Sequence, residues 1–283
     1  MDSTAATGTA GLDFRGNPGV AMHVLAAEFF RGEGPALEIL QRALPALKAS
    51  RDDRAELVIP GKQAGEVVLL AHLSHPSIDS AAFSGPVVIT ALAQWLESLP
   101  RRRYTYRLIF VPEASGAIDH LSGNIERLVA VFDLIGTGEA RAYSGLPTRV
   151  GGTLSDRAAL HAHRHQAGNL SPGVRPDLYA ALEALRKAVT AVEANATFRA
   201  TTPCEPNLGK RGLYPTVSTK DTKRQVRSMM NVLAYADGAH DLLTVADMLE
   251  VPVWDLAPIA ETLEQHGLLQ RVEDRNGGPV HAG

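Results

Sequence analysis

Short apolar runs alternate with amphipathic segments through the first half of the chain, and this alternation constrains the fold more than any other feature. Glu66–His72, Tyr104–Val111 and Val129–Ile135 have the length and apolar character of buried strands. Gly85–Leu96 and Gly116–Leu128, which lie between them, have helical patterns. Strands that alternate with helices predict an α/β domain with a parallel-rich sheet flanked by helices.

Further helices are predicted on either side of this core. Ala21–Lys48, with one interruption, and Arg175–Asn195 place apolar residues at three- and four-residue steps. Arg51–Glu56 is charged and has the character of a loop. Another helix is predicted to start at Asp156, with Ser155 as its N-cap.

The C-terminal region has a different and more compact pattern. From Thr222 onward, three short helices are followed by a strand that begins at Leu268, and Asp237–Gly238 reads as a turn between the first two helices. Three short helices and a β-ribbon predict a winged helix. The predicted organisation is a flexible tail over residues 1–18, a shortened α/β domain over 19–220 and a winged-helix domain over 221–283.

Composition excludes several classes of protein. Apolar residues make up 45% of the 283 residues and charged residues 21%, which is globular composition. A single cysteine, Cys204, excludes intrachain disulfides and cysteine-rich zinc modules. Neither an apolar run of about 18 residues nor a signal-peptide pattern is present. We therefore expect a cytoplasmic protein that has no membrane partner.

The charges argue against nucleic acid as a partner. The net charge is -3, and the third helix of the predicted winged helix, Val253–His266, carries Asp255, Glu261 and Glu264 but no Lys or Arg. A recognition helix requires cationic or amide side chains that can reach phosphates and base edges. We expect this module to serve packing or dimerisation, and the protein to be a homo-oligomer.

Polar residues follow each of the three predicted strands. The segment from His72 to Ser80 is the densest polar stretch, Glu113 follows the second strand and Glu139 lies beyond the third. In an open α/β sheet, ligands bind at such strand ends. Taken singly, these residues are better explained as helix caps and solvated loop residues. Taken together, His75, Glu113 and Glu139 come from three strand ends and could share one edge.

Other candidate residues have plainer alternatives. His161 and His165 would share a helical face, but a surface or buried polar pair is favoured over a metal site. Cys204 is either a nucleophile or, preferably, a small buried side chain. Lys210 and Arg211, between glycines, could grip a carboxylate or phosphate, although salt bridges in a boundary loop are favoured.

Five segments together resemble a known family. Similarity to segments of the zinc aminopeptidase-like proteins of unknown function is found at Leu73–Ser77, Phe83–Pro86, Arg103–Arg107, Phe110–Glu113 and, most specifically, Pro203–Pro215. The resemblance covers roughly residues 60–272 in pieces. It implies a co-catalytic exopeptidase fold followed by a C-terminal winged helix.

This sequence departs from the family pattern at the metal site. Ala81 stands where the family has the carboxylate that bridges two metals, and Asp79 is the only local replacement. The segment with the late histidine ligand is missing, and Glu139 stands where the family usually has aspartate. Because a bridging carboxylate offsets the repulsion between two zinc ions, the resemblance implies a centre that has been lost or reduced to one metal.

The resemblance, with its departures, implies a degenerate aminopeptidase-like protein that holds one zinc ion or none. His75, Asp79 and Glu139 would be the metal ligands, and Glu113 the base. If active, the protein would catalyse hydrolysis or transfer at an amide or aminoacyl bond of a small substrate in a specialised biosynthetic pathway. The substrate-binding candidates are His72, Ser77, Lys210 and Arg211. The alternative is a non-catalytic binding or scaffold protein, a pseudoenzyme that dimerises through its winged helix.

Overall fold

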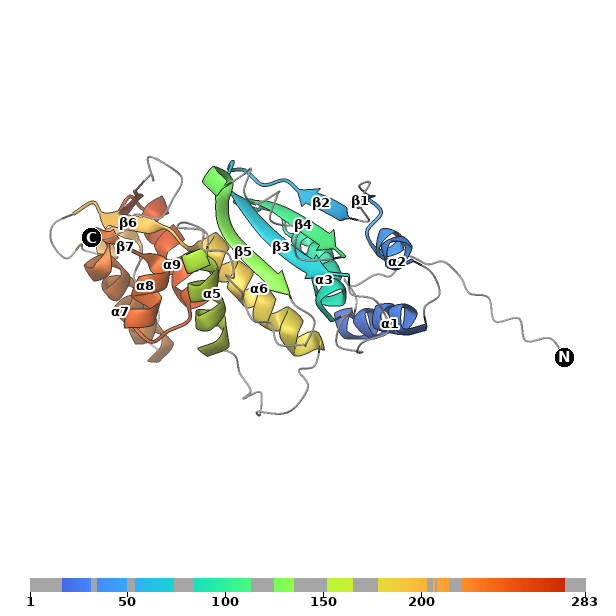
Figure 1. Ribbon diagram of the computed structural model, residues 1–283. Coiled ribbons are helices and arrows are strands. Elements are labelled where there is room, and N and C mark those ends of the chain that lie inside the picture. Colours follow the sequence, from blue (N-terminus) through green and yellow to red (C-terminus); the bar gives the residue numbers. More distant parts are fainter. Residues whose placement is uncertain are drawn as a thin grey trace. The chain divides into compact units, whose positions relative to one another are not determined.

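The structure is a computed structural model that divides into two compact units (Figure 1). The first unit contains Met1–Tyr143 and Leu170–Glu183, and the second contains Ser144–Asn169 and Ala184–Gly283. The chain therefore crosses between the units three times. The described residues are 17–31, 35–49, 54–73, 84–112, 125–134, 152–164, 178–202, 206, 208–213 and 220–272.

The first unit is built on a five-stranded sheet with the order β1-β2-β4-β3-β5. Strand β3 pairs in parallel with β4 and β5, whereas β2 is antiparallel to β4 and β1 is antiparallel to β2. The three strands expected from the sequence are thus confirmed, together with the parallel-rich sheet. The strands are β1 (Lys48–Ala49), β2 (Ala55–Ile59), β3 (Glu66–His72), β4 (Thr105–Val111) and β5 (Leu128–Leu134).

Helix α3 (Ser84–Ser98) covers one face of this sheet and packs on β3 and β4. Helix α1 (Pro18–Arg31) packs on α3, and α2 (Ala36–Ala43) packs on α1 (Figure 1). Near the start of α3, a Cβ on Gly85 would lie 2.7 Å from the carbonyl oxygen of Leu134. Glycine is therefore needed where this helix approaches the end of β5.

The second unit contains the winged helix that the sequence predicts. Its sheet has the order β7-β6-β8, and both β7 and β8 are antiparallel to β6. Helices α7, α8 and α9 follow the expected order, and α5 also belongs to this unit. The elements are α5 (Gly152–Arg164), α6 (Leu178–Ala194, from Ala184 on), β6 (Thr197–Ala200), α7 (Lys220–Tyr235), β7 (Asp237–Asp241), α8 (Leu242–Met248), α9 (Val253–Gln265) and β8 (Leu269–Arg271).

Several local predictions need correction. The segment Arg51–Glu56 is not all loop, because Ala55 and Glu56 begin β2. Helix α5 begins at Gly152, so Ser155 is a buried residue inside the helix and not its N-cap. Asp237–Gly238 begins strand β7, where Gly238 has a φ of +83° and a Cβ would lie 2.6 Å from Nε of Arg199.

Other expectations are confirmed or stay open. Gly267 follows the end of α9 with a φ of +66°, and its N–H donates to the carbonyl of Glu264. Most of the predicted helix Gly116–Leu128 lies outside the described residues; Ile125–Arg127 is a short 3₁₀ turn. The tail over residues 1–18 lies almost wholly outside them too. The boundary at residue 220 stays a prediction. No described helix has the length and apolar character that crossing a membrane requires.

Candidate functional site

The carboxyl ends of three parallel strands meet at one edge of the first unit's sheet. His72 ends β3 opposite Val111, the last residue of β4, and Ala71 pairs with Leu134, the last residue of β5. The segments that follow these strands therefore leave from a common edge. These segments carry the predicted ligand, base and substrate-binding positions, which are His75, Ser77, Asp79, Glu113 and Glu139.

Those five side chains lie outside the described residues, so their roles stay predictions. The structure does show the arrangement of strands on which these predictions depend. The strand ends are adjacent in the sheet, and the three strands run in the same direction. This is the arrangement in which open α/β sheets gather ligand-binding side chains.

The described part of the edge contains a pair of ionisable side chains. Nε2 of His72 lies 2.9 Å from Oδ1 of Asp133, which is on the neighbouring strand β5. Asp133 is in register with Leu70, so it projects from the same face of the sheet as His72. The two side chains are 12% and 21% exposed. His72 was a substrate-binding candidate; here its imidazole is held by a carboxylate.

Asp133 was not predicted as a functional residue. It lies inside the apolar run Leu-Val-Ala-Val-Phe-Asp-Leu, where periodicity indicates only a strand. A carboxylate within a buried strand, one residue before that strand ends, is itself unusual because burying a charge is costly unless the charge is paired. That cost was the signal in the sequence, and the partner that offsets it is His72.

Imidazole and carboxylate are ligands that zinc accepts, but a protein site for catalytic zinc requires about three of them. Within the described ranges, no three His, Cys, Asp or Glu side chains are grouped closely enough to hold a metal ion. His72 and Asp133 are instead hydrogen-bonded to each other. The described residues alone therefore do not fit a zinc site, and any metal would need the predicted ligands from the neighbouring segments.

The remaining substrate-binding candidates lie on the short turn Gly209–Arg211 of the second unit. Nη1 of Arg211 donates to the carbonyl oxygen of His266 at 2.7 Å, where α9 ends. This contact gives Arg211 a packing role, which was the alternative to ligand binding. The side chain of Lys210 is outside the described part of the structure.

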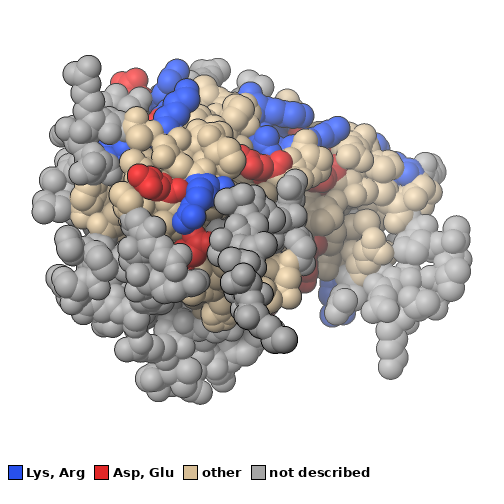
Figure 2. Space-filling view, turned by 90° about the vertical axis from the view of Figure 1, so that its right-hand side faces the viewer, with Lys and Arg blue, Asp and Glu red and all other residues tan. Residues whose placement is uncertain are grey.

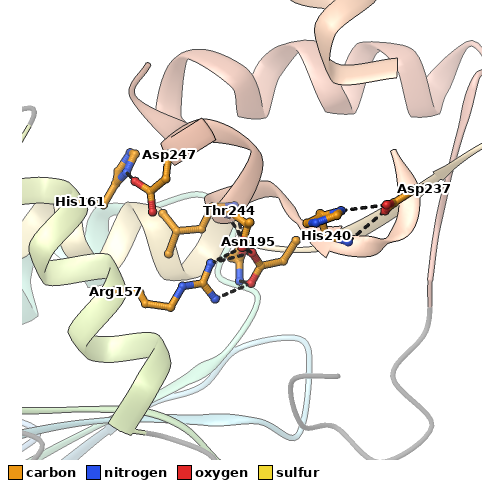
Figure 3. Close-up of polar contacts among 9 residues, drawn as sticks. Arg157, His161, Asn195, Asp237, His240, Thr244 and Asp247 are labelled. Carbon is orange, nitrogen blue, oxygen red and sulfur yellow. Dashed lines mark hydrogen bonds and ion pairs between the residues drawn. The ribbon is translucent and has the colours of Figure 1, made fainter. Parts of the chain in front are cut away.

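A second polar cluster lies between helices α5 and α8 of the second unit (Figure 3). Nδ1 of His161 lies 2.7 Å from Oδ1 of Asp247, and the N–H of Val253 donates to Nε2 of His161 at 2.8 Å. The imidazole is fully buried and forms a T-shaped pair with the ring of Trp254. Because both ring nitrogens are engaged within the protein, His161 is a buried polar residue and is not poised to bind a metal.

The same cluster contains an arginine clamp, which we define as Arg157, Asp241, Asn195 and Thr244. Figure 3 labels its residues Arg157, Asn195 and Thr244. Arg157 donates to both carboxylate oxygens of Asp241, at 2.8 and 2.7 Å. Nδ2 of Asn195 donates to the same carboxylate. Asp241 is also the N-cap of α8, because its carboxylate accepts from the backbone N–H of Thr244.

The electrostatics of the clamp follow from these contacts. Burial alone would raise the pKa of the Asp241 carboxyl. The hydrogen bonds from Arg157, Thr244 and Asn195, together with the charge of Arg157, outweigh that effect and hold the pKa well below its usual range. Helix α5 is thus fixed to the start of α8 by an ionised pair.

Surface charge is mixed where it can be seen. On the face shown in Figure 2, Lys and Arg side chains are interspersed with Asp and Glu. Asp255 and Glu261 of α9 are exposed, and Glu264 pairs with Arg271.

Comparison with known proteins places these features in context. Residues 196–271 match the winged helix-turn-helix family HTH_47, and residues 35–172 match DUF4910, a domain of unknown function. A Clostridium acetobutylicum protein named "Putative polysaccharide biosynthesis protein with aminopeptidase-like domain" is 26% identical over 240 residues, which cover 68% of this chain.

The fold of the chain also matches a solved structure. A crystal structure described as a "putative peptidase" from Clostridium acetobutylicum superposes with a TM-score of 0.61 at 22% identity, over 77% of this chain. The chain spans 55% of the length of the named relative and 60% of that crystallised chain. These similarities support an aminopeptidase-like fold that is followed by a C-terminal winged helix.

Proposed function

We propose that this chain is a degenerate aminopeptidase-like protein in which the two-zinc centre is lost or reduced to one metal. The observation that carries the proposal is the common edge at which β3, β4 and β5 end. The segments that carry the predicted metal ligands leave from this edge, yet Ala81 stands at the position expected to hold the bridging carboxylate. A methyl group cannot offset the repulsion between two adjacent cations.

The reaction that suits this site is hydrolysis or transfer at an amide or aminoacyl bond of a small molecule. If one ion is held, His75, Asp79 and Glu139 would hold it, and it would polarise the substrate carbonyl. Glu113 would take the proton of the attacking group. The name of the Clostridium relative favours a biosynthetic pathway over protein degradation as the setting.

Metal content tests the proposal directly. We expect purified protein, after mild dialysis and plasma emission analysis, to contain one zinc ion per chain or none. If an ion is present, His75→Ala should remove it because the imidazole is the strongest donor among the predicted ligands. His240→Ala is the matched control, since His240 is a surface histidine of the second unit and should leave the metal content unchanged. Two zinc ions per chain would contradict the proposal.

A second candidate function is a non-catalytic scaffold that forms dimers through the winged helix. The exposed acidic residues of α9 favour it over a DNA-binding role, and Tyr235 and Met248 of the same unit are exposed apolar side chains. In that case activity would be absent from a panel of amides and aminoacyl compounds, while light scattering would report a dimer.

Either function predicts that duplex DNA is not a ligand. Protein that neutralises phosphates binds DNA with an affinity that falls steeply as salt rises. We expect fluorescence anisotropy with a labelled duplex to show no binding of this kind at moderate ionic strength, because α9 presents acidic side chains. The expectation would be contradicted if the duplex bound in a salt-sensitive way and Asp255→Lys did not strengthen that binding. The interface would then lie elsewhere on the protein.

A further inference from the structure

We infer that Asp133 and His72 form a carboxylate–imidazole dyad in which Asp133 positions His72, and that Nδ1 of His72 accepts a proton during acyl transfer at an amide or ester. The inference rests on the proposed function and deepens it. It assigns a role to Asp133, and it makes His72 the proton acceptor of the metal-free form of the site, whereas Glu113 would be the acceptor if a metal ion were held.

The hydrogen bond determines which ring nitrogen is available. A carboxylate can only accept hydrogen bonds, so Nε2 of His72, 2.9 Å from Oδ1 of Asp133, carries the proton. In the neutral ring Nδ1 is then the nitrogen with a free lone pair. Within the part of the chain that the structure describes, no side chain or backbone group is bonded to Nδ1. One nitrogen is therefore fixed and the other is available.

The backbone around the pair holds it in place. The two residues lie on adjacent parallel strands whose register is continuous from Val67 to Ala71. Gly85 of α3 packs closely on the carbonyl of Leu134, the residue after Asp133. Because both side chains are mostly buried, water competes only weakly for their hydrogen bond. The imidazole is thus oriented by rigid elements, as a proton-transfer group must be.

Other histidines of the described chain show what distinguishes this pair. His161 also contacts an aspartate, but its second nitrogen is occupied by Val253. His240 pairs with Asp237 on the surface, where its side chain is 39% exposed. His72 combines a carboxylate partner, an uncommitted nitrogen and low exposure at a strand end. A purely structural ion pair would gain little at this place, because apolar side chains of similar volume are often as stabilising.

The step that we assign to the dyad is balanced. The attacking group is water or a substrate hydroxyl, whose proton passes to Nδ1 while its oxygen bonds to the carbonyl carbon. The imidazolium that forms is stabilised by the Asp133 carboxylate, as in other carboxylate–histidine sites. When the tetrahedral intermediate collapses, Nδ1–H returns the proton to the departing amine or alcohol. With water the net reaction is hydrolysis, and with a hydroxyl it is acyl transfer.

The tautomer of His72 is the first test, and it requires no substrate. In protein labelled with ¹⁵N at histidine, with His72→Gln to assign the signals, we expect His72 to be protonated on Nε2 and not on Nδ1. In Asp133→Asn the amide can donate to the ring instead, so we expect a shift towards the Nδ1–H form. An Nδ1–H tautomer in the parent protein, or no change in Asp133→Asn, would overturn the inference. So would ¹⁵N shifts that show a bond from His72 to added zinc.

Reactivity is the second test, with p-nitrophenyl acetate as a small activated ester. The quantity measured is the rate of p-nitrophenolate release above the background rate. We expect His72→Gln to abolish this rate and Asp133→Asn to lower it about tenfold or more. His240→Gln is the matched control from a surface pair and should retain the parent rate. Circular dichroism checks that each variant is folded. If His72→Gln does not fold, Asp133→Asn still tests the dyad because asparagine is nearly isosteric with aspartate. An unchanged rate in a folded His72→Gln protein would contradict the dyad.

The two proposals fail in different ways. Two zinc ions per chain would contradict the degenerate centre whatever the tautomer of His72. An Nδ1–H tautomer would contradict the dyad whatever the metal content.

Discussion

Asp241→Ala is expected to lower the free energy of unfolding of the second unit by about 3 kcal/mol. The substitution removes both hydrogen bonds from Arg157, the bond from Asn195 and the N-cap of α8. It also leaves the Arg157 guanidinium, which is 36% exposed, without its carboxylate. Loss of the N-cap alone contributes about 1 kcal/mol.

Denaturant unfolding monitored by circular dichroism measures this loss. Glu261→Ala is the control, because Glu261 is an exposed acidic residue of α9 in the same unit, and its removal should change stability only slightly. If the two variants were equally stable, the arginine clamp would be a surface contact of little energetic value.

The clamp also predicts how stability depends on pH. The pKa of Asp241 is lowered in the folded protein, so the folded state binds its proton less tightly than the unfolded state. Its contribution is therefore fully present above the unfolded pKa of about 3.9 and is lost as the pH falls below that value. Asp241→Asn should flatten this acid-side loss in unfolding curves measured at successive pH values.

Strands β3, β4 and β5 of the first unit are predictable because each is a short apolar run that is mostly buried on both faces. β3 lies inside the sheet and β5 lies beside it at the edge, and their apolar composition is visible without any knowledge of partners. Strand β2 could not be predicted in this way because it is half-exposed. Its buried Ala55, Leu57 and Ile59 alternate with polar or exposed positions, and the charged residues before it resemble a loop.

Helix starts and polar pairs are harder to predict because their partners are distant in the sequence. Ser155 has the residue type of an N-cap, but burial against the rest of the second unit outweighs that local preference and α5 begins three residues earlier. His161 meets residues 86 and 92 positions later in the chain. Periodicity carries no information about contacts of this kind.

The candidate site also has a part that the sequence predicts and a part that it does not. The edge where three strands end follows from the order of strands and helices, and the structure contains it. The pairing of His72 with Asp133 depends on the register of two strands that are separated by more than fifty residues of chain. Only the folded sheet shows that the two side chains meet.

His161→Ala is expected to lower the free energy of unfolding by about 3 kcal/mol, comparable to the loss of Asp241. The imidazole is fully buried, so its removal leaves a cavity, and the N–H of Val253 at the start of α9 loses its acceptor. Asp247 loses its partner on α5 at the same time. The cost is the sum of a void and an unsatisfied buried donor.

Hydrogen exchange and a second variant separate these two contributions. In His161→Gln the side-chain carbonyl can still accept from Val253, whereas the ring volume and the T-shaped contact with Trp254 are lost. We expect the Val253 amide to exchange much faster in His161→Ala than in His161→Gln, and α5 to exchange faster in both. If neither variant altered exchange in α5, the helix would be held by the Arg157 clamp alone, and the buried histidine would serve only to complete the start of α9.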